Sequence, residues 1–326
     1  MRCWAAFPRK PVFGKPRELE QAAAPPYNGL VPVRLAAKPG HFRNGYYTEG
    51  VSLNLVDIAV NLTSPAFDRD RGAVLARARS AGVTGVVVTG SSIDDSTLAI
   101  SLAQEHDGCV ATAGVHPHNA GTWDTESAPG RLLELASCGG PHVVAIGECG
   151  LDYNRNFSPG DAQRRCFDDQ LAIAARLGKP VFLHERDAFD DFLSILKRHR
   201  ANLPGAVVHC FTGGEKELEA YLALDCHIGI TGWICDERRG THLVPLAKRI
   251  PADRLLLETD APYLLPRNLP KARRVKDGRS GGRNEPSHLP HIAGFVARAV
   301  GKSPEQLAEE TGANAARLFG LPWSGI

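Results

Sequence analysis

Four ionisable side chains follow short apolar runs at widely separated places in the chain. Glu148 follows the run VVAIG, His184 follows PVFL, His209 follows AVV, and Asp260 ends the run LLLETD. Imidazole favours Zn²⁺, Mn²⁺ or Fe²⁺ as its ion, whereas carboxylates suit Mg²⁺ or Mn²⁺. If the apolar runs are strands that end at one place, these four residues predict a divalent-metal site. The mixture of ligands does not select one metal.

A single His or Glu after a strand is more often an ordinary loop residue than a ligand. The prediction here depends on repetition, because four such residues occupy the same position relative to four different runs. Within this set, Glu148 and Asp260 are also candidate catalytic residues, since a carboxylate can orient a water molecule and accept its proton.

Two further histidines belong to the segment GVHPH at positions 114–118, which ends another apolar run. Either His116 or His118 could bind a phosphate group or donate a proton. His116 is the stronger candidate for a catalytic role because it comes directly off the run. The alternative is that both histidines only shape the loop.

Basic and aromatic residues supply candidate substrate contacts. Arg267 and Arg283 border a stretch that is rich in Lys and Arg. Such a stretch is usually a solvated loop, but after the last strand it would overhang the site and attract a phosphate backbone. Trp233 and Tyr263 also follow apolar runs, and aromatic rings can stack on bases, although packing is their more common role.

These residues need a scaffold in which many strands end at one rim. From residue 53 onward, short runs rich in Val, Ile and Leu alternate with longer amphipathic stretches, as in parallel strands joined by helices. The expected strands are 55–60, 83–89, 109–115, 142–147, 180–183, 206–209, 227–231 and 254–259. The expected helices lie near 68–81, 94–106, 126–137, 161–177, 187–200, 214–224, 240–249, 287–300 and 304–318.

Eight strand–helix units over residues 53–321 predict an α/β fold of the (β/α)8 TIM barrel type. In such barrels the active-site residues lie at the C-terminal ends of the strands, where the predicted ligands fall. The alternative is a doubly wound open sheet. A nucleotide-binding sheet of that kind would usually carry a Gly-rich loop after its first strand, whereas this chain has Asn61-Leu-Thr there.

The composition is that of an ordinary globular protein, with 326 residues, 43% hydrophobic and 23% charged, and a net charge of +2. That charge is smaller than expected for a protein that coats nucleic acid. No run approaches the roughly 18 apolar residues of a membrane helix. The eight cysteines form no CxxC pair, which favours reduced thiols in a cytoplasmic protein. Residues 1–50 show no clear periodicity and are interpreted as a flexible or poorly ordered extension, with an organellar transit peptide as the alternative.

The motifs that contain the candidate residues resemble those of the TatD-family deoxyribonucleases, in the same order. The matching stretches are GVHPH at 114–118, IGECGLD at 146–152, PVFLH at 180–184, VHCFTG at 208–213, ETDAPY at 258–263 and RNEPSHLPH at 283–291. The likeness runs from about residue 53 to residue 321. It implies a cytoplasmic, metal-dependent nuclease, described for the family as a 3′→5′ exonuclease that uses Mg²⁺. It also implies that Glu148, His184 and His209 bind metal, with Asp260 as a further ligand or general base.

The chain departs from the family pattern at the end of the first expected strand. Many family members carry an HxH pair there, and this chain has Ala59 and Asn61 instead. One subgroup of the family is similar to this chain in having Asn-Leu-Thr at this place. The departure predicts one tightly held ion, with a weaker second ion recruited by the substrate phosphate, rather than a fully ligated two-metal centre.

The expected function is hydrolysis of phosphodiester bonds, as a 3′→5′ exonuclease on the ends of single-stranded DNA or RNA. The expected cofactor is a divalent ion, Mg²⁺ first, with Mn²⁺ or Zn²⁺ as alternatives. A metal-dependent ester or amide hydrolase, such as an aminoacyl-tRNA deacylase, would use the same barrel. An inactive binding or scaffold barrel is the second alternative. Neither a membrane nor an obligate protein partner is expected.

Overall fold

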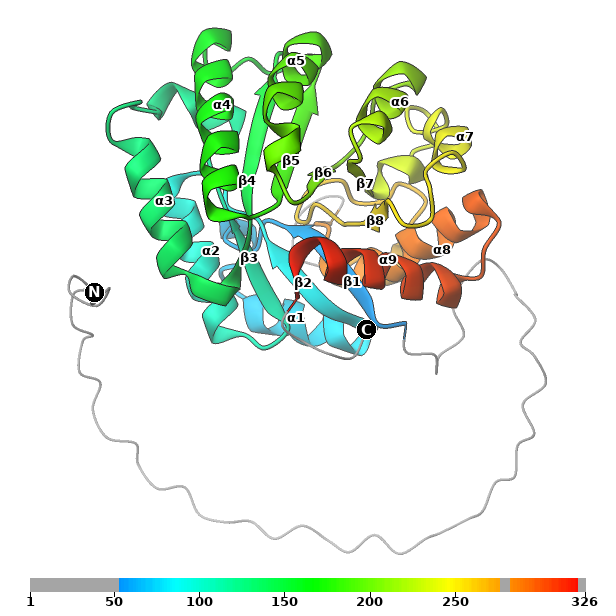
Figure 1. Cartoon of the computed structure of the whole chain (residues 1–326). Coiled ribbons are helices and arrows are strands. Elements are labelled where there is room, and N and C mark those ends of the chain that lie inside the picture. The colour runs from blue at the N-terminus through cyan, green and yellow to red at the C-terminus, as the bar shows by residue number, and fades with distance from the viewer. Residues whose placement is uncertain (1–52, 276–281, 322–326) are drawn as a thin grey trace, which may run out of the picture. The chain divides into compact units, whose positions relative to one another are not determined.

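The computed structural model describes residues 53–275 and 282–321. Its strands are β1 (Leu55–Val60), β2 (Val83–Val88), β3 (Cys109–Ala113), β4 (Val143–Asp152), β5 (Val181–Arg186), β6 (Ala206–Val208), β7 (His227–Ile230) and β8 (Leu255–Leu257). They form one parallel sheet in the order β1 to β8 (Figure 1). A parallel bridge between Val60 and Ala261 brings the end of β1 beside the segment that follows β8. The predicted (β/α)8 barrel is confirmed.

Helices connect the strands and cover the outside of the sheet (Figure 1). They are α1 (Arg71–Ser80), α2 (Ile93–Glu105), α3 (Ala128–Cys138), α4 (Gly160–Leu177), α5 (Phe189–His199), α6 (Glu215–Ala223), α7 (Leu243–Ala247), α8 (Leu289–Val300) and α9 (Pro304–Phe319). Gly178 ends α4 with a φ of 62°, the left-handed conformation that glycine adopts most easily. Ser303 begins α9 by accepting a hydrogen bond from the backbone N–H of Gln306.

The inside of the barrel is filled by strand side chains, and α9 closes one end of it. Phe182 and Leu256 cluster with Phe319 of α9. Asn314 of α9 donates a hydrogen bond to the carbonyl of Leu255, where β8 begins. Because α9 occupies the end at which the strands start, the predicted site residues lie at the opposite end, where the strands finish.

The fourth strand is longer than the sequence predicts. A strand over 142–147 would end before Glu148, but β4 continues to Asp152 and places Glu148 within the strand. Gly150 makes this extension compatible with the neighbouring strand β5. Its φ is 145°, and a Cβ atom there would lie 1.8 Å from the carbonyl oxygen of His184. Only glycine allows the two backbones to approach this closely.

Two predictions concern residues outside the described ranges. The interpretation of residues 1–50 falls within 1–52, and Lys276 and Arg279 of the basic stretch fall within 276–281. Among the described cysteines, Cys109, Cys149, Cys166, Cys210, Cys226 and Cys235 are buried or partly buried thiols outside any disulfide. Among the described helices, none has both the length and the apolar character that crossing a bilayer requires.

Candidate active site

The carboxylate of Glu148 is the centre of the site. Its Oε1 atom lies 2.9 Å from His184 Nδ1 and 2.8 Å from His209 Nε2. The Nε2 atom of His116 approaches the same oxygen to 3.2 Å. Glu148 comes from β4, His184 from β5, His209 from the residue after β6, and His116 from the loop after β3. The barrel therefore brings three of the four predicted ligands, together with His116, to one point.

Each predicted histidine ligand faces a second carboxylate with its other ring nitrogen. His184 Nε2 lies 3.4 Å from Asp152 Oδ2, and His209 Nδ1 lies 3.5 Å from Glu258 Oε2. Both carboxylates are buried. A metal-binding histidine usually directs its outer N–H at such a carboxylate, which sets the orientation and tautomer of the ring. This leaves His184 Nδ1 and His209 Nε2 free to face an ion beside Glu148.

His116 is oriented in a different way. Its Nδ1 atom accepts a hydrogen bond from the backbone N–H of His118 at 3.0 Å, so the neutral ring carries its hydrogen on Nε2. Burial lowers the pKa of His116 to about 4, although the charge of Glu148 opposes this. The ring is therefore neutral near pH 7 and donates its Nε2–H toward Glu148. For this reason His116 is better placed as a hydrogen-bond donor than as a metal ligand.

Asp260 lies after β8 and is held in place by Asn61. Asn61 Nδ2 donates a hydrogen bond to Asp260 Oδ1 at 2.9 Å. Burial raises the pKa of Asp260 to about 7, although the charge of His209 opposes the shift. A carboxylate with a pKa near the working pH is suited to accept a proton. Asn61, which stands at one position of the missing HxH pair, therefore orients the candidate general base.

The buried charge of Glu148 is balanced by its neighbours. Only 6% of Glu148 is exposed. Burial alone would raise its pKa, but the imidazoles of His116 and His209 outweigh burial and hold the pKa of Glu148 well below its usual value. Burial also opposes protonation of His209, yet Glu148 and Glu258 raise the pKa of His209 well above normal. A divalent cation between these groups would replace protons on the imidazoles.

These residues fit a divalent metal ion. One ligand atom from each of His116, Glu148 and His184 lies within 4.8 Å of the others. With His116 assigned as a hydrogen-bond donor, this group supplies Glu148 and His184 as ligands, and His209 joins them because its Nε2 lies 2.8 Å from the same Glu148 oxygen. The buried side-chain atoms that have no hydrogen bond in the described structure include three of this cluster, namely His184 Nε2, His209 Nδ1 and Glu258 Oε2. A cation on the Glu148 side of the rings would leave the ring hydrogens on the outer nitrogens, where Asp152 and Glu258 can accept them. The cluster can therefore hold a metal ion.

The predicted aromatic and histidine contacts lie around this cluster. Tyr263 follows β8 and is 57% exposed. Trp233 belongs to a short 3-10 helix after β7, and the Arg239 guanidinium lies 4.4 Å from the centre of its ring. His118 Nε2 lies 2.8 Å from Asp152 Oδ2, and its ring contacts the exposed ring of Phe157. Tyr263 and Phe157 are therefore the exposed rings of this group, whereas Trp233 and His118 are partly buried and contact Arg239 and Asp152.

The two predicted arginine contacts are already paired within the protein. Arg267 lies on the surface and contacts Glu237 at 3.2 Å. The side chain of Arg283 is 4% exposed, and its guanidinium donates to Asp70 and to the carbonyl of Ala66. The same guanidinium stacks on the ring of Phe67. Arg283 thus ties the segment before α8 to the segment before α1, and its predicted contact with substrate stays a prediction.

Replacing Arg283 with alanine is expected to lower the free energy of unfolding by roughly 1–3 kcal/mol, because Asp70 loses one of its two arginine partners and the carbonyl of Ala66 loses its donor. Urea denaturation followed by circular dichroism measures this change. Arg267→Ala is the matched control, and its exposed ion pair should be worth under about 1 kcal/mol. An Arg283→Ala protein of unchanged stability that binds oligonucleotides poorly would restore the substrate role predicted from the sequence.

Several residues of the site were not predicted from the sequence. Asp152 lies four residues after Glu148, an even spacing that points both side chains to the same side of one strand. A predicted strand that continued to residue 152 would have included Asp152. Glu258 belongs to the same run as Asp260, again at an even spacing. Phe157 carries no signal in the sequence, because its position beside His118 depends on how the loop after β4 folds.

A (β/α)8 barrel with imidazole and carboxylate ligands where its strands finish is the architecture of a metal-dependent hydrolase. Residues 56–320 match the family model described as TatD related DNase. The chain belongs to this family, as its motifs predict.

Similar proteins cover most of the chain. The 3′-5′ ssDNA/RNA exonuclease TatD of Rahnella sp. is 54% identical over 271 residues, which are 82% of this chain and 98% of that protein. The protein of the same name from Klebsiella pneumoniae is 51% identical over 272 residues, 83% of this chain and 100% of that protein. The crystal structure of the TatD homolog YJJV from Escherichia coli matches with a TM-score of 0.74 at 27% identity, over 83% of this chain and 100% of that chain.

Proposed function

We propose that this protein is a metal-dependent nuclease that removes nucleotides from the 3′ end of single-stranded DNA or RNA, with Mg²⁺ as its ion. One observation carries the proposal: His184 and His209 converge on Glu148 in a chain that is 54% identical to an enzyme named for this activity. Mn²⁺ is the expected substitute ion. The proposal includes a cytoplasmic location, which the buried cysteine thiols of the barrel support.

Glu148, His184 and His209 would hold the ion. When bound, the ion would polarise a phosphate oxygen and lower the pKa of a nearby water molecule. Asp260, with a pKa of about 7, orients that water and accepts its proton. His116 is neutral and directs its Nε2–H into the site, so it donates a hydrogen bond to a phosphate oxygen as negative charge develops there.

Phe157 is expected to bind a base of the strand end. Its side chain is 69% exposed, and its ring centre lies 4.7 Å from that of His118. Removing one stacked base contact costs about 1–3 kcal/mol, so Phe157→Ala should raise the KM for single-stranded DNA by roughly 5- to 100-fold at little cost in stability. Steady-state kinetics measure this change, and Phe157→Tyr should retain most of the affinity. Equal KM values for Phe157→Ala and the wild type would rule out stacking at this residue.

The proposed function is tested with single-stranded oligonucleotides labelled at the 5′ end. Purified protein should yield a ladder of products that shorten from the 3′ end, and a chelator should abolish it until Mg²⁺ or Mn²⁺ is restored. The same oligonucleotides labelled at the 3′ end should release a mononucleotide first. Absence of cleavage with every ion, in protein that binds Mn²⁺ by calorimetry, would exclude the nuclease. Release of an acid from aminoacyl-tRNA would support the alternative hydrolase instead.

A further inference from the structure

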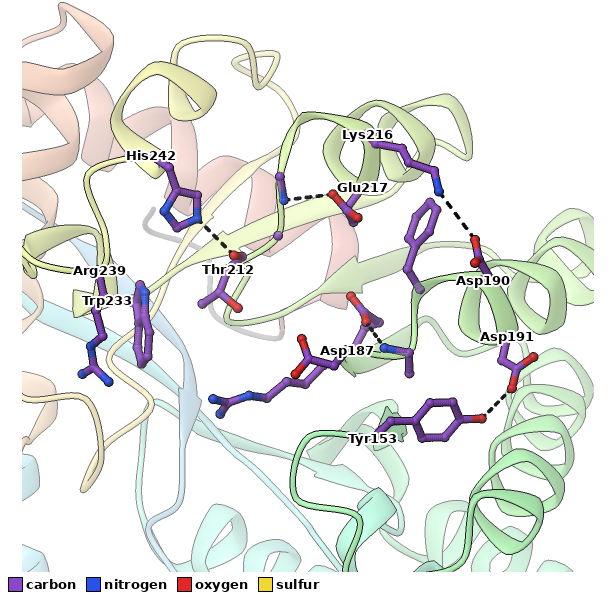
Figure 2. Close-up of a pocket in the computed structure, with 16 residues that line it drawn as sticks. Tyr153, Asp187, Asp190, Asp191, Thr212, Lys216, Glu217, Trp233, Arg239 and His242 are labelled. Carbon is purple, nitrogen blue, oxygen red and sulfur yellow. Dashed lines mark hydrogen bonds and ion pairs between the residues drawn. The ribbon is translucent and has the colours of Figure 1, made fainter.

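A cavity of about 770 Å³ lies beside the metal cluster, between the segments that follow β5, β6 and β7. It is bordered by Glu185 and Arg186, which follow His184, and by Thr212, three residues after His209. Figure 2 shows Tyr153 and Asp187 on one side of this cavity and Trp233 and His242 on the other. The cavity therefore continues directly from the strand ends that carry the ligands.

Almost every charged or titratable group around the cavity already has a protein partner. Four carboxylates accept hydrogen bonds: Glu185 from Tyr221, Asp187 from Asn154, Asp191 from Tyr153 and Glu217 from the backbone N–H of Gly214. Two ion pairs join Asp190 to Lys216 and Arg239 to Asp236. His242 contacts the carbonyl of Thr212. These contacts satisfy the hydrogen-bonding groups of the lining, and Asp190 and Asp191 each also face a basic side chain, Lys216 and Arg164 respectively. They also leave one side chain unexplained.

That side chain is Arg186. In residues 53–275 and 282–321, no hydrogen bond or ion pair involves its guanidinium. Arg186 is partly buried and is the last residue of β5, two positions after His184. Alternate residues of a strand point to the same side, and two positions advance the chain by about 7 Å. Arg186 therefore lies on the same side as His184, within a distance that one nucleotide can span.

An unpaired guanidinium in a partly buried cavity indicates an anionic ligand. Arginine presents a planar set of donors that matches a phosphate group in two places at once. Trp233 forms part of the opposite wall, and Arg239 covers one face of its indole (Figure 2). The other face is available to a planar ring such as a nucleobase.

We propose that this cavity binds the nucleotide next to the scissile bond, with Arg186 on the phosphate adjacent to the one that is cleaved. The inference depends on the proposed nuclease function and adds a second phosphate site to it. Its consequence is a length preference. A dinucleotide has only the scissile phosphate and gains nothing from Arg186, whereas a trinucleotide places its second phosphate on Arg186.

The test compares kcat/KM for dTpdT and dTpdTpdT with full-length protein and Mg²⁺. In the wild type the trinucleotide should be preferred by about 10- to 100-fold, the effect of one charge-assisted hydrogen-bonding contact. Arg186→Ala should reduce this ratio to within about threefold of one, and Arg186→Lys should retain part of it. Because both substrates report on the same protein sample, partial misfolding of a variant does not change the ratio.

Arg165→Ala is the matched control, since Arg165 lies on α4 and pairs with Asp161 away from the cavity. It should keep the wild-type ratio. Binding of labelled oligonucleotide to chelator-treated protein should also show a salt dependence whose slope is smaller by about 0.7 for Arg186→Ala. If the wild type cleaves both substrates and Arg186→Ala keeps the full length preference, the second phosphate site is wrong and the proposed nuclease function stands. A wild type that cleaves neither would overturn the proposed function.

Discussion

Replacing His184 with alanine is expected to lower kcat/KM for single-stranded DNA by at least about 1,000-fold, equivalent to roughly 4 kcal/mol of transition-state stabilisation. His184 Nδ1 lies 2.9 Å from Glu148 Oε1, and the ring links that carboxylate to Asp152. Its loss removes a ligand and one of the two imidazoles that contact Asp152, the other being that of His118. The measurement is steady-state hydrolysis over a range of Mg²⁺ concentrations, together with calorimetric titration of Mn²⁺.

His199→Ala is the matched control for this experiment. His199 ends α5 and pairs with Asp168 on the outside of the barrel, so its removal should change neither ion binding nor cleavage by more than about twofold. The prediction separates a ligand from a structural residue, because only the loss of a ligand weakens Mn²⁺ binding. A His184→Ala protein that binds Mn²⁺ normally and cleaves at the wild-type rate would contradict the assignment of the metal centre.

Asp260→Asn is expected to lower kcat by roughly 100- to 10,000-fold while KM changes little, because the amide cannot accept the proton of the attacking water. The substitution keeps the shape of the side chain, and its oxygen can still accept the hydrogen bond from Asn61. The loss should therefore appear in the chemical step. Single-turnover kinetics under saturating protein measure that step directly.

The control for Asp260→Asn is Asp168→Asn, which makes the same change at a surface ion pair on α4. That variant should keep the wild-type kcat. If Asp260→Asn weakens Mn²⁺ binding as strongly as His184→Ala does, Asp260 acts as a ligand and not mainly as the base. If it retains a wild-type single-turnover rate, it has neither role.

The position of Asn61 bears on the number of ions in the site. Many members of the family carry a second histidine there, whereas here Asn61 donates to Asp260 and Ala59 is fully buried and apolar. Because those two imidazoles are absent, the candidate ligands in the described structure are Glu148, His184 and His209, which would hold one ion. Titration of Mn²⁺ in the absence of substrate is therefore expected to show one tight site. This agrees with the sequence prediction, in which the second ion binds weakly and is recruited by the substrate phosphate.

The order of apolar runs along the chain was enough to predict the barrel and most of its helices. A buried parallel strand is recognised from a short run of consecutive apolar residues, and that pattern is local. The ligands could be predicted for the same reason, since each residue directly follows or ends such a run and all parallel strands finish at one rim. The end of β4 was predicted too early, because the extension of this strand depends on Gly150. A glycine at this position lets the backbones of β4 and β5 approach closely.

Pairing between distant side chains was decided only by the tertiary structure. Arg186 follows the fifth predicted strand and Arg283 lies in the segment after the eighth, and nothing local in the sequence shows which of the two arginines stays unpaired. Folding places Arg283 against Asp70, 213 positions away, and leaves Arg186 facing a cavity. The tautomer of His116 likewise depends on a backbone N–H that only the folded loop supplies. Residue types thus determine which chemistry is available, whereas long-range contacts determine which of those groups remain free to perform it.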